Sequence, residues 1–295
     1  MNYKLKSMIL FPMNVLYSIS PRLELKIMFF LKQKYRLNLE KPVTYNEKLN
    51  WQKLYYHNED MSICSDKYLV RKYVSDHGCG DILNTLLWQG YNPEAIPFSK
   101  LPEQFVIKAT HGSGFNIICR NKSELNINEI VPILKSWLNT KYIKCYGESW
   151  YGRLKPRIIV ESFIESEPQK DLFDYKFFCF DGEPEYVYVD TWKDGKHHIN
   201  MYDVNFNLLK NVSLGYPTDM SDNICKPENF KEMLEVARKL SGNFPHVRID
   251  LYSVSGKIIF GEMTFSKEAG FDRILPYEFD VEMGKNFNVI RKKDF

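Results

Sequence analysis

The sequence lacks several patterns that would place it in a well-known class. Its six cysteines are scattered, with no Cys-x-x-Cys pair, which argues against a disulfide framework or a zinc site and favours reduced thiols in a cytosolic protein. No apolar run reaches the ~18 residues of a membrane span. The formal net charge of +3 is too small to indicate nucleic-acid binding by itself.

Several catalytic signatures are missing as well. No Gly-Lys-Ser/Thr of a P-loop occurs, and Gly112-x-Gly114 has no third glycine, so it is not a dinucleotide fingerprint. No His-Glu-x-x-His and no metal-like Cys/His spacing is present. His111 is the only histidine beside a convincing candidate site, and His197-His198 are expected on an exposed turn. The sequence therefore gives no support for a nucleophilic triad.

A chain of 295 residues has room for one large or two medium domains. Helical patterns come first, then strands mixed with helices, then mostly strands, which predicts an α+β or mixed α/β protein. A polar stretch at Ser162–Asp171 reads as a loop and marks a soft boundary. We therefore expect a helical region at residues 1–60, one lobe at 61–163 and a second lobe at 164–295.

The expected elements follow from local signals. Ser20-Pro21 and the capping box Thr44–Glu47 begin helices. Periodic apolar residues predict further helices, and β-branched and aromatic residues predict strands. The further helices are Ser65–His77, Glu129–Leu138 and Asn229–Leu240; the strands are Phe105–Thr110, Ile117–Cys119, Arg157–Ile164, Tyr175–Phe180 and Glu185–Asp190.

The N-terminus contains an apolar run, Met8–Ile19, preceded by Lys4 and Lys6. This resembles a signal peptide, but Pro12 and Asn14 interrupt it and no clear cleavage site follows. We expect helices packed on the body of a cytoplasmic protein. A second apolar cluster, at residues 27–31 near basic residues, leaves open a weak peripheral contact with the inner membrane surface.

The most informative segment is Phe244–Phe265, which reads as two strands joined by a short turn. Because strand side chains alternate, Arg248 and Asp250 share one face of the first strand, and Glu262 and Thr264 share one face of the second. In a hairpin Asp250 falls opposite Glu262 or one position away. Two carboxylates this close need a positive partner. The favoured one is a hard cation such as magnesium.

A second segment, Phe105–Ile118, places Lys108 on an apolar strand before the small, glycine-bearing loop Thr110–Asn116. The backbone N–H groups of such a loop can wrap a phosphate, and the lysine supplies charge. An ordinary hairpin turn explains the same residues. Glu161 lies in an apolar strand and needs a partner, which a salt bridge at the strand end would provide.

Two other charged features carry little information alone. Lys67, at the start of an expected helix, reads as a solvated surface lysine. Asp174 and Lys176 fall on one face of a strand and read as a surface ion pair, which contributes little stability.

The order and spacing of these segments resemble the ATP-grasp superfamily, and more closely its TupA-like branch of teichuronopeptide and capsular polysaccharide biosynthesis. The resemblance covers nearly all of the chain from about Lys41 onward. It is carried by Pro42–Trp51, Ser65–Arg71, Val106–Gly114, Arg157–Phe163, Asp174–Phe178, Val247–Tyr252 and Gly261–Phe265. It implies an ATP-grasp fold in which two α+β lobes clasp ATP, preceded by N-terminal helices.

The resemblance also implies roles for particular residues, with ATP and Mg2+ as cofactors. The implied ATP contacts are the lysines Lys67 and Lys108, the loop residues His111, Gly112, Ser113 and Gly114, and Glu161 at the adenine-ribose hinge. The implied catalytic residues are Arg248 and Lys176, and the implied metal ligands are Asp250, Glu262 and Thr264. Thr264 stands where many ATP-grasp enzymes have asparagine, and its hydroxyl reaches a metal only where the backbone lies closer.

The activity implied is that of an ADP-forming carboxylate-amine ligase, an enzyme that makes an amide through an acyl phosphate. The implied partners are an amine or amino acid and a uronic acid or similar carboxylated sugar of a surface polysaccharide, with no nucleic acid. Three alternatives remain open: a glycosyltransferase, although no Asp-x-Asp motif is present; an ATP-dependent sugar kinase; and a non-catalytic module that binds ATP or a glycan.

Overall fold

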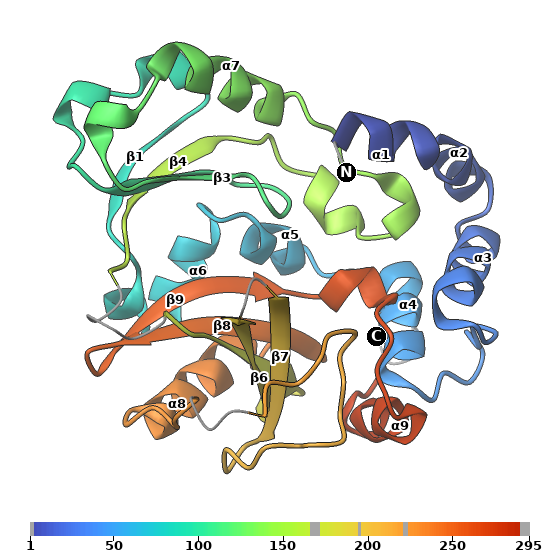
Figure 1. Ribbon diagram of the computed structural model, residues 1–295. Helices are drawn as coiled ribbons and strands as arrows, with labels where there is room; N and C mark the ends of the chain where they lie inside the picture. The colour runs from blue at the N-terminus through green and yellow to red at the C-terminus, as the bar shows by residue number, and fades with distance from the viewer. Residues whose placement is uncertain (1–2, 166–171, 194–195, 221–223, 290–295) are drawn as a thin grey trace. The chain divides into compact units, whose positions relative to one another are not determined.

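The computed structural model describes residues 3–165, 172–193, 196–220 and 224–289 (Figure 1). The chain divides into two compact units. Unit 1 comprises Met1–Asn58, Ile143–Ser149 and Phe173–Phe295, and unit 2 comprises Glu59–Tyr142 and Trp150–Leu172. Both units combine helices with an antiparallel sheet, so the chain has the α+β architecture that the sequence predicts.

Unit 1 is built on a five-stranded sheet of order β7-β6-β5-β8-β9, in which every neighbouring pair is antiparallel. Its strands are β5 (Asp174–Phe180), β6 (Glu183–Lys193), β7 (Lys196–Asp203), β8 (His246–Val254) and β9 (Lys257–Thr264). Its helices are α1 (Tyr3–Ile9), α2 (Phe11–Ile19), α3 (Pro21–Gln33), α4 (Tyr45–Tyr55), α8 (Phe230–Ser241) and α9 (Tyr277–Asn286).

The hairpin of β8 and β9 sets the register of the polar face. Ser255 and Gly256 form its two-residue turn with φ of 49° and 75°, as a turn matching the strand twist requires. Asp250 lies directly opposite Glu262, which confirms the hairpin prediction. A bulge follows, and a Cβ on Gly261 would lie 2.9 Å from the Asp250 carbonyl oxygen. Glycine at 261 therefore permits this register.

The two faces of this sheet differ in polarity. On one face Val247, Ile249 and Leu251 are fully buried, and α8 packs there with its own buried Met233 and Ala237. The alternate residues of β8 turn the other way, so burial of one face fixes which side chains form the polar face.

The N-terminal helices fall in the same compact unit as residues 173–295 rather than in a region of their own. The capping box of α4 forms as expected. The Thr44 hydroxyl accepts a hydrogen bond from the Glu47 backbone N–H, and the Glu47 carboxylate accepts one from the Thr44 backbone N–H. Helix α4 packs against α9, where a Cβ on Gly284 would lie 2.1 Å from the Val43 carbonyl oxygen. The close backbone approach brings α4 and α9, which lie far apart in the sequence, into one core.

A fully buried carboxylate, Glu24, lies on the inner side of α3. Neither of its oxygens has a hydrogen-bond partner among the residues described. Burial raises its pKa to about 8, against the opposing charge of Lys53. The folded protein therefore holds this proton over a pH range where the unfolded chain, with a glutamate pKa of about 4.3, has released it.

The stability that this proton contributes is present below about pH 4 and is lost as the pH rises through about 8. Glu24→Gln cannot ionise, so its melting temperature should fall less than that of the wild type between pH 5 and pH 8.5. Thermal denaturation at several pH values measures this, with Glu40→Gln, an exposed site, as the matched control. Parallel curves for the Glu24 variant and the wild type would contradict the assignment.

Unit 2 is built on a four-stranded sheet of order β1-β4-β2-β3. Its strands are β1 (Leu86–Gly90), β2 (Phe105–Ala109), β3 (Asn116–Cys119) and β4 (Ile158–Ser162). Its helices are α5 (Asp60–Ser65), α6 (Val70–Asp76) and α7 (Ile127–Leu138). Phe105, Ile107 and Ile158 are fully buried in its core, together with Leu134 of α7.

The helix expected at Ser65–His77 begins later, at Val70. Asp66 accepts hydrogen bonds from the backbone N–H groups of Tyr68 and Leu69, at 2.9 Å each. Such a side-chain turn competes with the helix. Lys67 consequently lies in a turn, and its own N–H bonds the Thr110 carbonyl oxygen at 3.1 Å.

Candidate active site

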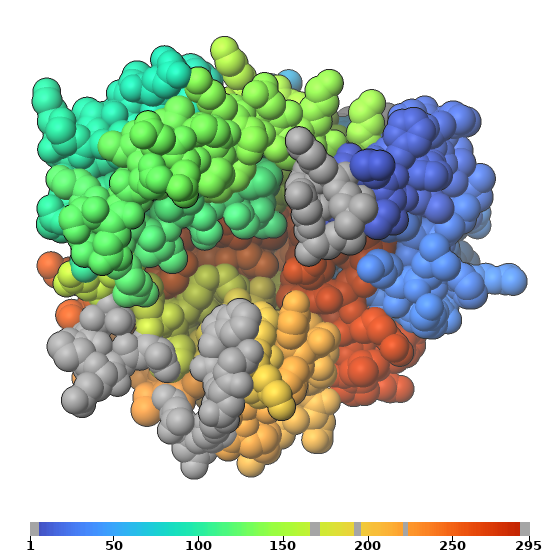
Figure 2. Space-filling model, turned by 45° about the horizontal axis from the view of Figure 1, so that its top comes forward, coloured from blue at the N-terminus to red at the C-terminus, as the bar shows by residue number. Residues whose placement is uncertain are grey.

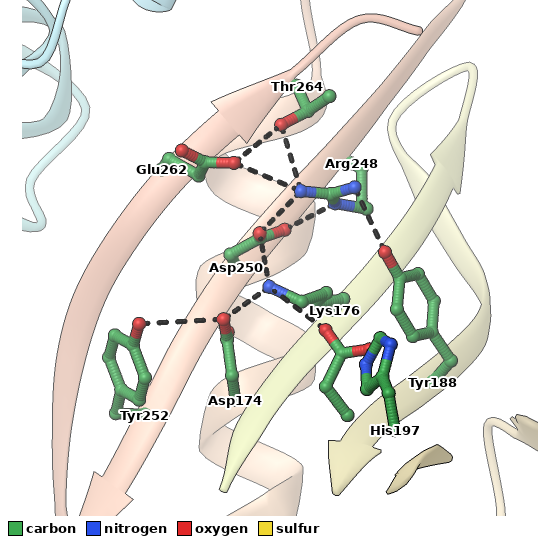
Figure 3. A network of polar contacts seen from close by, with 10 residues as sticks. Asp174, Lys176, Tyr188, His197, Arg248, Asp250, Tyr252, Glu262 and Thr264 are labelled. Atoms are coloured by element: carbon green, nitrogen blue, oxygen red, sulfur yellow. Dashed lines mark hydrogen bonds and ion pairs between the residues drawn. The ribbon is translucent and has the colours of Figure 1, made fainter. Parts of the chain in front are cut away.

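A row of polar side chains crosses four strands of unit 1. Tyr188 on β6 lies opposite Lys176 on β5, Lys176 lies opposite Asp250 on β8, and Asp250 lies opposite Glu262 on β9. Directly opposite residues share a face, so the row stands on the sheet face opposite to α8. Figure 3 shows these side chains converging.

Arg248 supplies a positive charge between the two carboxylates. Its Nε and Nη2 donate to the two oxygens of Asp250 at 2.6 Å each, and Nη2 also donates to Glu262 Oε1 at 3.1 Å. The Thr264 hydroxyl accepts from Nη2 at 3.0 Å and donates to Glu262 Oε1 at 3.0 Å. Thr264 therefore bridges Arg248 and Glu262 in this arrangement.

Tyr188 holds the other end of the guanidinium. Its hydroxyl accepts from Arg248 Nη1 at 3.0 Å. Burial alone would lower the pKa of Arg248, but Asp250 and Tyr188 outweigh it and raise that pKa well above its ordinary value. Arg248 is thus a fixed, oriented positive charge.

Lys176 is a second buried cation in the network. Its Nζ donates to Asp250 Oδ2 at 2.8 Å and also to Asp174, and lies 3.7 Å from Asp190 Oδ2. Burial lowers the pKa of Lys176, whereas Asp250 and Asp174 raise it, and the net result is well above the ordinary value. The interpretation of Asp174 and Lys176 as a surface pair is wrong, because Lys176 is buried.

His197 and Asp190 extend the network, although the sequence patterns assign neither residue a role. His197 Nε2 lies 2.9 Å from Asp190 Oδ1. The expectation of an exposed turn is wrong for His197, which is half-buried on β7 opposite Trp192. The alternation of Tyr186, Tyr188 and Asp190 along one strand was the available signal for β6, but nothing local identified β7 as its neighbour.

The donor set at this site fits magnesium. Among the residues that the structure describes, no group of three or more His, Cys, Asp or Glu side chains is arranged to hold a metal ion. Magnesium, however, is commonly held by one or two carboxylates together with phosphate oxygens of a substrate. The Glu262 side chain is 38% exposed, whereas that of Asp250 is 2% exposed and already bound by Arg248. Glu262 is therefore the accessible ligand of the pair.

In unit 2, Glu161 is buried on β4 and has two cationic partners. Lys108 Nζ lies 2.8 Å from Glu161 Oε2, and Arg71 Nη1 lies 3.1 Å from Glu161 Oε1. Arg71 also donates to the Asn84 carbonyl oxygen at 2.7 Å. Two cations around one carboxylate leave a net positive charge beside β2, which suits an anionic ligand. The sequence patterns do not predict Arg71 as a partner of Glu161, because helix spacing gives no sign of a contact with β4.

The glycine-bearing loop follows β2 and is tied at several points. Gly112 and Gly114 have φ of 68° and 78°, the left-handed region that glycine adopts without strain. Lys67 Nζ donates to the Gly112 carbonyl oxygen at 3.0 Å, and His111 Nε2 lies 3.3 Å from the Thr140 carbonyl oxygen. Burial lowers the pKa of His111, and nearby Lys67 adds to the shift.

The loop also packs on α7. The ring centroids of His111 and Phe115 are 5.3 Å apart, and those of Phe115 and Trp137 are 5.6 Å apart.

The predicted site residues fall into two groups. Lys67, Lys108, His111–Gly114 and Glu161 lie in unit 2, and Lys176, Arg248, Asp250, Glu262 and Thr264 lie in unit 1.

An α+β chain with a lysine-flanked glycine loop in one unit, and paired carboxylates beside a buried arginine in the other, has the features of an ATP-grasp protein. A family model confirms this class: TupA-like ATP-grasp matches residues 47–288. The chain belongs to the TupA-like ATP-grasp family. A comparison with curated proteins gives no match.

The solved structures that are similar to this chain include two ligases and a synthetase. D-alanine–D-alanine ligase from Bacillus anthracis complexed with ATP has a TM-score of 0.41 and 14% identity, covering 70% of this chain and 56% of its own. The Helicobacter pylori enzyme has a TM-score of 0.42 and 14% identity, covering 77% and 62%. N5-carboxyaminoimidazole ribonucleotide synthetase from Thermus thermophilus has a TM-score of 0.41 and 11% identity, covering 72% and 48%. The chain spans less than two thirds of each of these proteins.

Proposed function

We propose that the protein is an ATP-dependent, ADP-forming ligase that joins a carboxylate to an amine as an amide. The proposed acceptor is a uronic acid or similar carboxylate of a surface polysaccharide, the amine is an amino acid or related compound, and the location is the cytoplasm. The observation that carries the proposal is Arg248 bound by both Asp250 and Glu262. Such a charged cluster stabilises anions in a transition state and requires no protein nucleophile.

Unit 2 contributes the phosphate contacts in this proposal. Lys108 and Lys67 supply positive charge, and the backbone N–H groups of the loop at 111–114 supply donors for phosphate oxygens. Glu161 keeps Lys108 oriented through the 2.8 Å ion pair. Family membership supports ATP as the source of those phosphates.

Unit 1 contributes the charge that acts on the reacting groups. Glu262, the accessible carboxylate of the pair, would hold magnesium together with phosphate oxygens, and the ion when bound neutralises phosphate charge. Arg248, kept in place by Tyr188, and Lys176 can each contact a phosphoryl or carboxylate oxygen. Because both cations are buried and already oriented, they need little reorganisation as negative charge develops.

The proposed reaction has two steps. A carboxylate oxygen of the acceptor attacks the γ-phosphorus, the bond from that phosphorus to the β-γ bridging oxygen breaks, and ADP leaves with an acyl phosphate remaining. The amine nitrogen then attacks the carbonyl carbon, the C–O bond to phosphate breaks, and phosphate leaves. The amine loses a proton, and one original carboxylate oxygen departs with the phosphate.

The experiment follows that oxygen. The protein is incubated with ATP, magnesium, mixed amino acids and a uronic acid labelled with oxygen-18 in its carboxylate, and the products are examined by mass spectrometry. We expect ADP, an acceptor heavier by one amide condensation, and one labelled oxygen in the released phosphate. Omitting the amino acids is the matched control and should remove the amide product.

Other outcomes identify other functions. A phosphorylated acceptor with ADP would show a kinase, and sugar transfer with ATP unchanged would show a glycosyltransferase. ATP binding without product across a panel of acceptors and amines favours a non-catalytic module. Failure to bind ATP at all would overturn the proposal.

A further inference from the structure

The helices α1, α2 and α3 expose an unusual amount of apolar surface. Ile19 is 77% exposed, Met8 73% and Phe11 66%. These helices belong to unit 1, and some of their atoms lie at the surface visible in Figure 2, where they are blue. Isolated exposed apolar side chains are common, but several on neighbouring turns mark an interaction surface.

The exposed residues of α1 and α2 form one stripe. Met8, Phe11, Val15 and Ile19 are all exposed and recur at intervals of three or four residues, so they share one helical face. Backbone hydrogen bonds from Leu10 N to Lys6 O (3.0 Å) and from Asn14 N to Leu10 O (2.9 Å) carry the helical pattern across the junction. The stripe is therefore continuous from α1 into α2.

The opposite side of these helices already packs on the protein. Leu10, Met13 and Tyr17 contact the core cluster of unit 1. Helix α2 carries no charged residue and has no fully buried one. Leu10, Met13 and Tyr17, and not the exposed stripe, therefore attach α2 to unit 1.

Helix α3 repeats the pattern. Leu25 and Phe29 are fully buried on one side, whereas Leu23, Phe30 and Leu31 are exposed. A helix that needed only to cover its own core would be polar on its outer side. The outer side of α3 instead carries exposed apolar residues beside exposed basic ones, which fits an environment that is partly apolar.

The charge of the segment indicates which environment. Residues 1–36 contain one acidic residue, Glu24, which is fully buried. The basic residues of the segment are Lys4, Lys6, Arg22, Lys26, Lys32, Lys34 and Arg36. Arg22, Lys26, Lys32, Lys34 and Arg36 are exposed, so the surface around the apolar stripes is positive and complements a negative one.

We propose that α1–α3 dock the protein on an anionic membrane surface, with the apolar stripe in the headgroup region and the basic residues on lipid phosphates. In the described part of the chain no helix is long and apolar enough to cross a bilayer. Exposed apolar residues beside basic ones are typical of helices that lie in the plane of the interface. This inference stands independently of the proposed catalytic function.

The test is sedimentation of the full chain with vesicles of phosphatidylcholine alone or with phosphatidylglycerol. We expect binding to the mixed vesicles, weak binding to phosphatidylcholine alone, and weaker binding at high salt. A Phe11→Trp variant adds a second readout, since its excess emission over wild type should shift to the blue on the mixed vesicles. Absence of binding to the mixed vesicles would overturn the proposal.

Two variants test the two parts of the surface. Phe11→Ser with Ile19→Ser should weaken binding about tenfold or more, and Arg22→Gln with Lys26→Gln should weaken it about fivefold per charge. The matched control is Ile118→Ser with Ile133→Ser, which removes two exposed apolar side chains from unit 2.

The control should bind as the wild type does. Equal losses in all three variants, or no loss in the first two, would contradict docking through α1–α3. A concentration-dependent dimer in solution that the Phe11/Ile19 variant abolishes, without vesicle binding by the wild type, would assign the surface to a second copy of the chain. Circular dichroism of each variant establishes that it is folded, and the Phe11→Trp readout tests the surface without removing apolar area.

Discussion

Replacing Glu262 by glutamine is expected to reduce ATP turnover by about a thousandfold while leaving the protein folded. The amide keeps the size of the side chain but loses the negative charge that binds Arg248 and that the proposed magnesium ion needs. Removing one charged or hydrogen-bonding group that acts on a transition state costs about 10²–10³ in rate, and a metal ligand belongs to the upper end. The measurement is release of ADP and phosphate under saturating ATP and magnesium.

The fold should survive because the Glu262 side chain is 38% exposed, so its charge is partly solvated in the folded protein as well as in the unfolded chain. The melting temperature of the Glu262→Gln variant is expected within a few degrees of that of the wild type. Glu278→Gln changes another exposed glutamate of unit 1 and should leave both activity and stability unchanged. Near-normal turnover by the Glu262 variant would place the metal ligands elsewhere.

The part of this site that the sequence predicts is the part set by local geometry. Alternation along a strand puts Arg248 and Asp250 on one face, and the short turn expected at Ser253–Lys257, which the structure places at Ser255–Gly256, limits their partners on β9. The same local rules predicted the capping box of α4 and two strands at Phe105–Thr110 and Ile117–Cys119, which the structure places at Phe105–Ala109 and Asn116–Cys119. Short-range rules therefore narrow the register to two possibilities, Asp250 opposite Glu262 or one position away, without any knowledge of the rest of the fold.

The identity of the cation between the carboxylates was harder to predict. Two carboxylates on a hairpin indicate a positive charge but not its source, and the hairpin itself supplies Arg248. Lys176 reaches Asp250 from 74 residues away in sequence. Pairing of β5 with β8 is determined by burial of their common apolar face against α8, which no local pattern reveals.

The same limitation explains Arg71 and Lys67. Arg71 reaches Glu161 across 90 positions of the chain. The turn at Lys67 depends on Asp66 capping and on a backbone bond to Thr110, so helix propensity alone predicted too early a start. Tertiary contacts override local propensity here.

Replacing Asp250 by asparagine is expected to destabilise the protein by about 3–5 kcal/mol as well as abolish turnover. The side chain is 2% exposed, and both oxygens accept from cations: Arg248 at 2.6 Å twice and Lys176 at 2.8 Å. An asparagine is neutral and directs an N–H group at one of these donors. Urea denaturation measures the loss, and the melting temperature should fall by roughly 10 °C.

The contrast with Glu262→Gln separates the contribution of a carboxylate to activity from its contribution to stability. Both changes remove one negative charge from the same row, but only the one at Asp250 leaves two buried cations short of a partner. If the unpaired charge is the cause, Asp250→Asn combined with Arg248→Gln should recover part of the lost stability, because the double variant removes a cation together with its partner. Activity should stay absent, since the proposed mechanism needs Arg248 to act on the reacting groups. A double variant less stable than either single one would instead assign Asp250 a packing role, and equal stability of Asp250→Asn and the wild type would show that the buried ion pair contributes nothing to the fold.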